Sequence, residues 1–179
     1  MSAPRLPGGP TQDEIMAVSL FKLGLRHSDT VLEIGCGTGK VTVALAGQVR
    51  EVIAIDRRPE ATGAATEAVQ QAGRENVAIS CSDALSFLAG DQIYDCAFLG
   101  GTKHLDRILP VLAPKVKRTI VVNAVLVSTL TTAVDTMQRL GIFRAAVQVQ
   151  VARSHQLAGS IMFRPVDPVF IVVGGGTAC

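Results

Sequence analysis

The first motif that could bind a ligand is a glycine-rich loop, Gly35-Cys36-Gly37-Thr38-Gly39, which directly follows the mostly apolar residues 31–34. Glycines let a backbone turn sharply and let a ligand approach where a Cβ would obstruct it. A dinucleotide fold favours the spacing G-x-G-x-x-G, but the sixth position here is Lys40, and no G-K-[ST] phosphate loop follows. The loop therefore predicts a ligand-binding turn of another kind, with the spacing G-x-G-x-G after an acidic Glu33.

Two acidic residues stand where the next apolar runs end. Asp56 closes the run of residues 52–55, and Asp83 follows the run of residues 77–81. Because the carboxyl ends of neighbouring parallel strands meet at one sheet edge, Asp56 should lie beside the glycine loop, where its carboxylate could accept both hydroxyls of a ribose. Both residues are also good helix N-caps, Asp83 for a short helix over 84–88. Ligand binding and capping therefore stay open at both positions.

The elements that must position these residues are short β-branched runs that alternate with helical patterns. We predict strands at 30–34, 51–55, 77–81, 93–99 and 118–124, and helices at 38–47, 60–72, 103–112 and 128–140. An earlier helix should begin at Thr11-Gln12-Asp13-Glu14, whose S/T-x-x-E pattern is typical of a capped start, and run to about Gly24. This alternation predicts an α/β fold with a doubly wound, mostly parallel sheet.

The last third of the chain departs from that alternation. Residues 145–152 and 168–174 are strand-like, and the irregular stretch between them has no convincing helix. We therefore predict that these two segments form an antiparallel edge pair, which brings the sheet to seven strands. The apolar-rich stretch from Leu157 to Phe163 within the connection is an expected subunit contact.

Composition bounds the class of protein. A chain of 179 residues with 48% apolar residues suits one domain, residues 1–179. A net charge of +2, no Trp and one Tyr favour neither a nucleic-acid partner nor a membrane surface, and the absence of an apolar signal segment predicts a cytoplasmic protein. The four cysteines lack metal-ligand spacing, and two lie in runs predicted to be buried strands, so we expect reduced packing residues and no metal site: Cys36, Cys81, Cys96 and Cys179.

The whole chain resembles the decarboxylating precorrin and cobalt-precorrin methyltransferases of cobalamin biosynthesis, which are class I S-adenosylmethionine-dependent enzymes with a Rossmann-like fold. The lead Pro7-Gly8-Gly9-Pro10-Thr11 is the most telling element, because ordinary small-molecule methyltransferases lack it. The resemblance also rests on Glu33-Ile34 with the glycine loop, Val41-Thr42, Ala44-Leu45-Ala46, residues 52–57, Pro59-Glu60-Ala61, Asp83-Ala84, Gly100-Gly101, Val151-Ala152-Arg153 and Pro168-Val169.

The resemblance implies S-adenosylmethionine contacts from Thr11, the loop Gly35–Gly39, Asp56 and Ala84, where Asp83-Ala84 would hold the adenine. Thr11 can also cap the first helix, and the two roles are compatible. The implied activity is methylation of a meso carbon, C15, of a corrin precursor, coupled to loss of carbon dioxide from a ring acetate. The resemblance further implies a homo-oligomer, of which a tetramer is one form, and a second methylation at C5 by another subunit. A start at Met1 favours such a separate form over a fused enzyme.

A tetrapyrrole substrate carries many carboxylates, so its binding should use Arg and Lys. The expected substrate contacts are Gly100, Gly101, Lys103 and Arg153, with Arg107 and Arg164 as further candidates. Arg153 ranks first, whereas Arg107 on an amphipathic helix could equally be a solvated surface charge. The catalytic group stays unassigned: His104, Arg153 and His155 are the candidates, and the two histidines could deliver a proton or be incidental. Thr102-Lys103-His104 departs from the small residues usual in the family.

Two other hypotheses stay open at this point. The same fold could methylate RNA or a protein, although Leu99-Gly100-Gly101-Thr102 lacks the Asn-Pro-Pro-Tyr type of motif used for amino groups of bases. The chain could also be a binding module that has lost the chemistry, which the intact glycine loop and Asp56 argue against.

Overall fold

The computed structural model of the chain describes residues 9–178, so Cys179 and residues 7 and 8 of the lead lie outside the described residues. The helices are α1 (Asp13–Leu23), α2 (Lys40–Ala46), α3 (Pro59–Gln71), α4 (Ala84–Phe87), α5 (Leu105–Leu112), the 3-10 turn η1 (Ala113–Lys115) and α6 (Val127–Arg139). The strands are β1 (Thr30–Ile34), β2 (Glu51–Asp56), β3 (Val77–Cys81), β4 (Tyr94–Leu99), β5 (Val116–Ala124), β6 (Phe143–Val149), β7 (Ala152–Leu157), β8 (Ser160–Pro165) and β9 (Val169–Gly175). In this part of the chain no helix combines the length and apolar character needed to cross a membrane.

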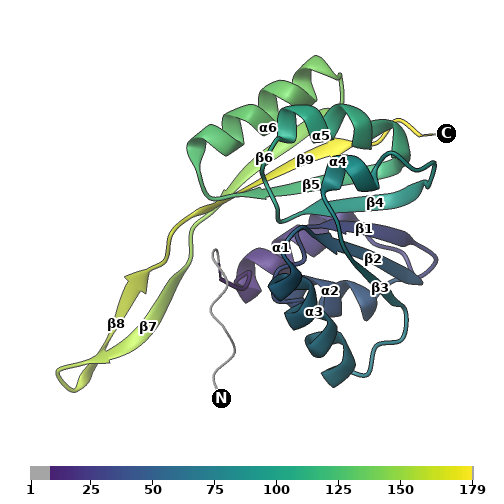
Figure 1. Cartoon of the computed structure of the whole chain (residues 1–179). Coiled ribbons are helices and arrows are strands. Elements are labelled where there is room, and N and C mark those ends of the chain that lie inside the picture. The colour runs from purple at the N-terminus through teal and green to yellow at the C-terminus, as the bar shows by residue number, and fades with distance from the viewer. Residues whose placement is uncertain (1–8, 179) are drawn as a thin grey trace.

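Seven strands form one sheet in the order β3-β2-β1-β4-β5-β9-β6 (Figure 1). Strands β1 to β5 pair in parallel, and β9 runs antiparallel to both β5 and β6. The predicted α/β fold with a mostly parallel seven-stranded sheet is confirmed, and so is the antiparallel pairing of the last two strands. Of these last two strands, however, β6 alone lies at an edge of the sheet, because β9 stands between β5 and β6. The apolar β9 is mostly buried, while β6 alternates half-buried and exposed residues.

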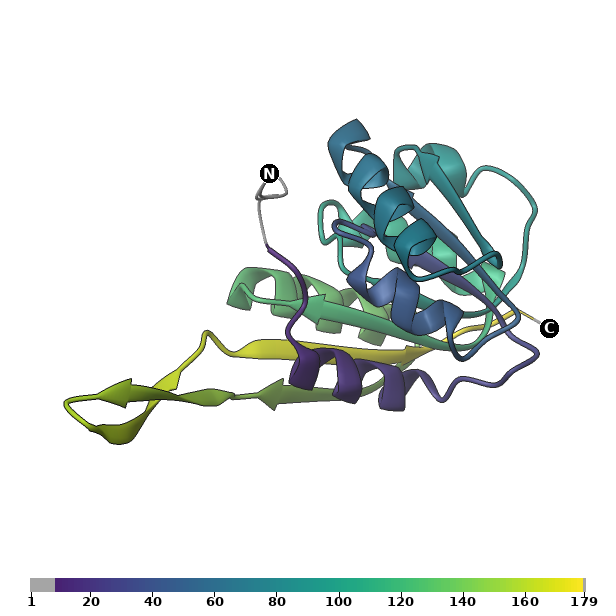
Figure 2. The ribbon, with the colours of Figure 1, turned by 90° about the horizontal axis from the view of Figure 1, so that it is seen from below.

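Helices cover both faces of the sheet (Figures 1 and 2). One buried cluster joins the sheet to α1, α2 and α3, and a second joins it to α4, α5 and α6. Successive residues of β1 point to opposite faces, so Val31 belongs to the first cluster and Leu32 to the second. This two-sided burial explains why the central strands are apolar in their middle, and most of their polar side chains lie near the strand ends.

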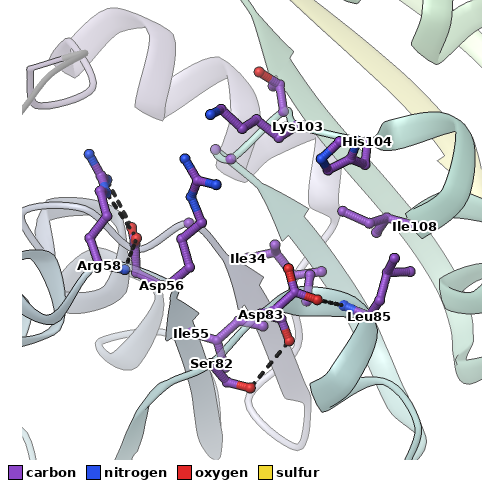
Figure 3. Close-up of a pocket in the computed structure, with 16 residues that line it drawn as sticks. Ile34, Ile55, Asp56, Arg58, Ser82, Asp83, Leu85, Lys103, His104 and Ile108 are labelled. Carbon is purple, nitrogen blue, oxygen red and sulfur yellow. Dashed lines mark hydrogen bonds and ion pairs between the residues drawn. The ribbon is translucent and has the colours of Figure 1, made fainter.

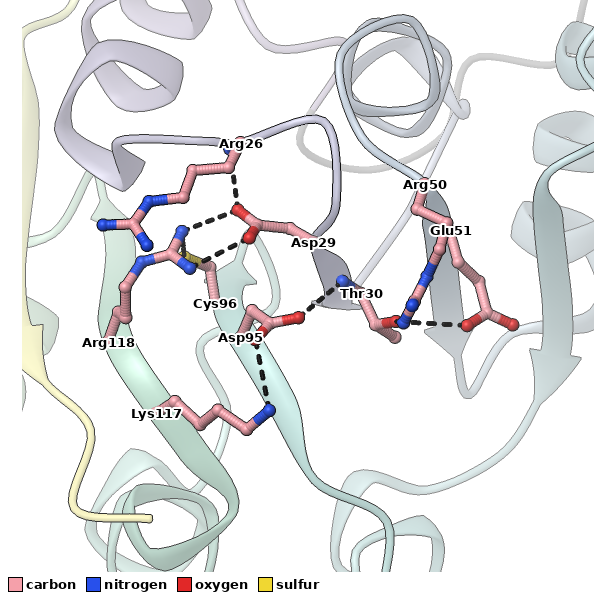
Figure 4. A network of polar contacts seen from close by, with 9 residues as sticks. All are labelled: Arg26, Asp29, Thr30, Arg50, Glu51, Asp95, Cys96, Lys117 and Arg118. Atoms are coloured by element: carbon pink, nitrogen blue, oxygen red, sulfur yellow. Dashed lines mark hydrogen bonds and ion pairs between the residues drawn. The ribbon is translucent and has the colours of Figure 1, made fainter. Parts of the chain in front are cut away.

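A charged network ties the strands together at the amino edge of the sheet, opposite the glycine loop (Figure 4). Asp29, only 1% exposed, accepts hydrogen bonds from both terminal nitrogens of the Arg118 guanidinium at 2.9 and 2.6 Å, and from the Arg26 N–H at 2.8 Å. Burial raises the pKa of Asp29, but the Arg118 and Arg26 bonds outweigh it and leave this pKa below its usual range. The backbone N–H of Thr30 donates to Asp95 at 2.8 Å, which links β1 to β4. The network holds β1, β4 and β5 in register, and thereby the loops at their other ends.

The capped start predicted at Thr11 is wrong. Helix α1 begins at Asp13 with Gln12 as the N-cap, and no side chain caps it. The two acids of the first turn are engaged elsewhere: Asp13 pairs with Lys40 at 2.7 Å, and Glu14 pairs with Arg153 at 2.8 Å. A carboxylate held by a cation from another element does not turn back to the backbone, so the local pattern was overridden by tertiary contacts.

The irregular stretch predicted between the last two strands is also wrong. It is a two-stranded antiparallel hairpin, β7 with β8, which projects from the body of the fold as an arm (Figures 1 and 2). The hairpin turns at Ala158 (φ 48°) and Gly159 (φ 77°), both left-handed as a tight two-residue turn requires. The sequence signal was weak because the turn lacks Asn-Gly or Asp-Gly, and because both strands are almost wholly exposed and so need no apolar alternation.

Burial separates the described cysteines. Cys36 and Cys96 are buried, as expected of packing residues, whereas Cys81 is exposed. The expectation of burial fails at Cys81 because β3 is an edge strand with no neighbour beyond it.

Candidate active site

Two loops interlock at the carboxyl edge of the sheet. The backbone N–H groups of Gly35 and Cys36 both donate to the carbonyl of Ile55, at 2.7 and 3.1 Å. The two N–H groups of Gly100–Gly101, which follow β4, both donate to the carbonyl of Ile34, at 3.0 and 2.9 Å. The glycine loop is therefore anchored to β2 on one side and to the loop after β4 on the other.

The three glycines of the loop have different reasons to be glycine. A Cβ at Gly35 (φ 86°) would lie 2.3 Å from the backbone nitrogen of Gly101, and a Cβ at Gly39 (φ 78°) would lie 2.7 Å from the Cα of Ala65 in α3. Only Gly37 (φ 54°) faces open space, since a Cβ there would have no neighbouring atom within 4 Å. Close backbone packing thus explains Gly35 and Gly39, whereas at Gly37 the space that the sequence interpretation assigns to a ligand is open.

A cavity of about 420 Å³ opens beside these loops. Figure 3 shows Asp56 with Arg58 on one side of it and Lys103, His104 and Ile108 on the opposite side. Apolar side chains provide much of the wall, and the carboxylates and cations stand around it. The residues that line it are Ile34, Gly35, Ile55, Asp56, Arg57, Arg58, Ser82, Asp83, Ala84, Leu85, Gly100, Gly101, Thr102, Lys103, His104 and Ile108.

Asp56 is a buried carboxylate, 5% exposed, at the end of β2. It accepts hydrogen bonds from the Gly37 N–H at 3.1 Å, from the Arg58 N–H at 3.1 Å, and from Nε and a terminal nitrogen of the Arg58 guanidinium at 3.0 and 2.9 Å. Burial raises the pKa of Asp56, but these bonds outweigh it and leave the pKa below its usual range. Asp56 is not the N-cap of α3, a position that Arg58 holds. The charged form of this carboxylate in the cavity wall is therefore favoured.

The sequence left both helix capping and ligand binding open for Asp83-Ala84. In the structure Asp83 caps a helix and Ala84 lines the cavity. The carboxylate of Asp83 accepts from the N–H groups of Leu85 and Ser86 at 3.0 and 3.3 Å, so Asp83 is the N-cap of α4. Ala84 is 9% exposed and its small side chain forms part of the cavity wall. Capping by Asp83 places Ala84 beside the cavity.

Glu33 lies on β1, two residues before the glycine loop, and is only 1% exposed to solvent. Among the described residues, its Oε2 has no hydrogen-bond partner. Burial, together with the negative charge of Asp56, raises the pKa of Glu33 to about 7, and the nearby Thr42 hydroxyl opposes this only in part. Burial beside the same two acids raises the pKa of the Cys36 thiol to about 12, so this thiol is not a nucleophile.

A second cavity, of about 520 Å³, adjoins the first, and Gly35, Arg58, Gly100 and Thr102 line both. The predicted cofactor residues Thr11, Cys36, Gly37 and Thr38 line this second cavity. Its other lining residues include Gln12, Lys40, Asn123, Val125, Leu126, Thr129 and Asp167. The predicted cofactor residues therefore lie around two connected cavities, except Gly39, which caps α2.

Only some of the basic residues that were predicted to contact the substrate lie at a cavity. Lys103 and His104 line the first cavity, and His104 adopts a left-handed backbone (φ 58°) before α5. Arg107 lies on the exposed side of α5 and lines neither cavity, as the alternative of a solvated charge supposes. Arg153, Arg164 and His155 lie on the β7–β8 hairpin and line neither cavity.

Sequence reasoning missed several residues that line the cavities. Arg57 and Arg58 directly follow Asp56, and Asn123 lies near the end of β5. A signal for Asn123 existed: it is a polar residue at the carboxyl end of a predicted parallel strand, which is the argument that singled out Asp56. Gln12, which lines the second cavity, was missed because the predicted helix cap singled out the neighbouring Thr11.

Comparison with known proteins agrees with this geometry. A family model described as the precorrin methyltransferase domain matches residues 7–174. A relative from Methanosarcina acetivorans, a probable cobalt-precorrin-6B C(15)-methyltransferase (decarboxylating), is 45% identical over 172 residues, which are 93% of this chain and 94% of the relative. The crystal structure of precorrin 8W decarboxylase from Methanobacterium thermoautotrophicum has a TM-score of 0.89 at 33% identity, covering 93% of this chain and 92% of that one.

A second solved structure, precorrin-6y C5,15-methyltransferase from Geobacter metallireducens, also has a TM-score of 0.89, at 26% identity and covering 96% of this chain and 94% of that one. The matched length includes the glycine loop, the Asp56 strand end and the loop after β4. The chain belongs to the precorrin methyltransferase family.

Proposed function

We propose that this chain uses S-adenosylmethionine to methylate C15 of cobalt-precorrin-6B and releases carbon dioxide from a ring acetate of that substrate. The observation that carries the proposal is the meeting of the glycine loop, the Asp56 carboxylate and Ala84 around two adjoining cavities, in a chain that matches its named relative over nearly its whole length. The reaction class is thus a carbon methylation coupled to decarboxylation.

The cavities fit the cofactor in size and in chemistry. An adenine ring would pack against the apolar wall formed by Ala84, Leu85 and Ile108, and the ribose hydroxyls would donate to Asp56. The amino-acid end would extend past Gly37 toward Thr11 in the second cavity. When bound, this cofactor supplies a methyl group activated by the positive charge on sulfur.

Asp56 must release a partner to receive a ribose. A carboxylate offers about four lone-pair directions, and those of Asp56 already accept bonds from Gly37 and Arg58. We therefore expect the Arg58 side chain to give up at least one bond to Asp56 when the ribose binds. The Gly37 bond is a backbone contact and would stay, which keeps the carboxylate aimed at the sugar.

The chain's main contribution to methyl transfer would be positioning. Holding two reactants in an aligned geometry lowers a barrier by roughly 7 to 11 kcal/mol, and an electron-rich ring carbon needs little help from a base. Lys103 and His104 stand at the first cavity, where they are suited to hold substrate carboxylates, and His104 is the better-placed candidate proton donor. A role for Arg153 or His155 stays a prediction.

The proposal is tested with purified protein, S-adenosylmethionine and cobalt-precorrin-6B. The expected result is a product that has gained one methyl group and lost one carbon dioxide, seen by mass spectrometry. Calorimetry should show S-adenosylmethionine binding that weakens at least about tenfold in Asp56→Ala, since a charge-assisted bond is lost. Absence of binding in the unaltered protein, or methyl incorporation into RNA but not into the tetrapyrrole, would overturn the proposal.

We also propose that the chain forms a homo-oligomer through the β7–β8 hairpin. Apolar side chains on this arm are exposed: Leu157 at 56%, Ile161 at 63% and Phe163 at 66%. Ile161 and Phe163 lie on one face of the arm and Leu157 on the other. Exposed apolar side chains on a projecting arm favour a protein contact. Phe163→Asp should shift the mass in light scattering to that of a smaller species while the circular dichroism spectrum of the folded domain is unchanged. The C5 methylation would then belong to a separate protein, because the two connected cavities form one cofactor site.

A further inference from the structure

Asn123 lines the second cavity, and its side chain has a buried polar atom without a hydrogen-bond partner among the described residues. Asn123 lies on β5, one residue before the end of the strand, and its backbone pairs with Ile171 of β9. Its Oδ1 lies 3.0 Å from the Oγ of Ser19. Its Nδ2 is buried and has no hydrogen-bond partner among the described residues. A buried donor without a partner costs free energy, so this amide is arranged for a group that the chain does not supply.

Ser19 fixes the orientation of that amide. Ser19 is 1% exposed on α1, and its single hydroxyl hydrogen is shared between Oδ1 of Asn123 and the carbonyl of Ile15 one turn earlier, at 2.8 Å. Helix α1 packs against β5, so the hydroxyl and the amide are held by two packed elements. With its oxygen at Ser19, the amide of Asn123 points its N–H groups away from that hydroxyl, on a residue that lines the cavity.

The surroundings of Asn123 indicate what the partner is. Val125 and Leu126 line the same cavity and are 59% and 64% exposed, although they are apolar. Gly35 and Gly100 connect this cavity to the one that would hold the adenosine. A ligand here would therefore place an apolar face on Val125 and Leu126, and a hydrogen-bond acceptor at Asn123. A tetrapyrrole with a carboxylate rim has both features.

We propose that Asn123 is a substrate-binding residue whose Nδ2–H donates to a carboxylate oxygen of the tetrapyrrole, while Val125 and Leu126 contact the face of the macrocycle. Ser19 acts as a positioning residue for the amide. This inference rests on the proposed function, and it adds a specific anchor for the substrate. The cofactor also has a carboxylate, and the experiment separates the two sources.

The test measures two affinities separately for each variant. Calorimetry with S-adenosylhomocysteine reports the cofactor site, and absorbance titration with cobalt-precorrin-6B in the presence of S-adenosylhomocysteine reports the substrate without turnover. Asn123→Ala should weaken tetrapyrrole binding about tenfold, because a bond to a charged acceptor is lost. Asn123→Asp should weaken it more, by about a hundredfold, because a carboxylate then faces a carboxylate. Affinity for S-adenosylhomocysteine should stay within about twofold of the unaltered protein.

Asn76 provides the matched control. It is also a half-buried asparagine, but its Nδ2 already donates to the carbonyls of Ala46 and Val49, both at 3.0 Å. Asn76→Ala should lower the melting temperature and leave both affinities unchanged. Ser19→Ala, which removes the positioning hydroxyl, should weaken tetrapyrrole binding less than Asn123→Ala does.

The outcomes that overturn the inference are distinct from failure of the proposed function. An Asn123→Asp variant that binds the tetrapyrrole as tightly as the unaltered protein, or more tightly, shows that the amide does not meet a carboxylate. A loss confined to S-adenosylhomocysteine affinity assigns Asn123 to the cofactor instead. If the unaltered protein binds S-adenosylhomocysteine but no tetrapyrrole, the proposed substrate is wrong and the anchor falls with it.

Discussion

Replacing Glu33 by glutamine should change how the stability of this protein depends on pH. Glu33 is buried and its pKa is raised from 4.5 to about 7, chiefly by burial and further by Asp56. Below pH 4.5 the carboxyl is protonated in both folded and unfolded chains, so it imposes no cost. As the pH rises toward 7, the unfolded chain releases this proton while the folded chain retains it, so the free energy of unfolding falls. Above pH 7 the full cost is present.

The size of that cost follows from the shift. Each pKa unit corresponds to about 1.4 kcal/mol, so the difference between 4.5 and about 7 corresponds to about 3 kcal/mol. Glutamine has nearly the same shape and cannot ionise. Glu33→Gln should therefore match the unaltered protein near pH 4 and exceed its free energy of unfolding by about 3 kcal/mol at pH 8.

Urea unfolding of both proteins at pH 4, 6 and 8, without ligand, measures this difference directly. Subtracting one curve from the other removes the contributions of groups common to both. Glu67→Gln is a matched control, because Glu67 is exposed on α3 and its replacement should have a small effect that is the same at each pH. A Glu33→Gln effect that does not grow between pH 4 and pH 8 would refute the reasoning, since it would mean that the buried carboxyl ionises as easily as in the unfolded chain.

Three other predictions rest on backbone packing, on the amino-edge network and on thiol burial. Gly35→Ala should lower the free energy of unfolding by about 3 kcal/mol, because the added Cβ would lie 2.3 Å from a backbone atom. Gly37→Ala should lower it by only about 1 kcal/mol, through backbone strain. Denaturant titration measures both, and the reverse ranking would contradict this prediction. Asp29→Asn should cost about 3 kcal/mol at pH 7 by leaving its guanidinium partner without a countercharge, and a loss below about 1 kcal/mol would show the pair to be unimportant. A maleimide should label Cys81 in the folded protein and reach Cys36 only in urea, as peptide mapping by mass spectrometry can check; equal labelling in the folded state would contradict the burial of Cys36.

Much of the architecture could be predicted from the sequence because it follows from local patterns. Unbroken apolar runs indicated strands covered on both faces, and the helical spacing between them indicated crossovers, so the parallel sheet followed. The glycine loop after β1 and the acid at the end of β2 could be brought to one edge by that topology alone. The resemblance to a family then added a cofactor role for Thr11 and Ala84, which no local pattern indicated.

Other features depended on contacts between residues far apart in the chain. The predicted capping box at the start of α1 did not form, because the acids of the first turn pair with cations from other elements. Lys40 pairs with Asp13, and Arg153 pairs with Glu14. The hairpin was hidden because strands exposed on both faces carry no alternating pattern.

At the candidate active site, too, some features follow from local sequence and others from contacts between distant residues. The sequence by itself determined which residues end each strand, because periodicity and turn chemistry are written in neighbouring residues. Only the tertiary structure decided that Gly35 packs against Gly101 and that the Arg58 guanidinium binds Asp56. It also decided that Asn123 lines a cavity while its Nδ2 has no partner among the described residues. The physical reason is that distances across the sheet depend on strand order and packing, which no local stretch of sequence contains.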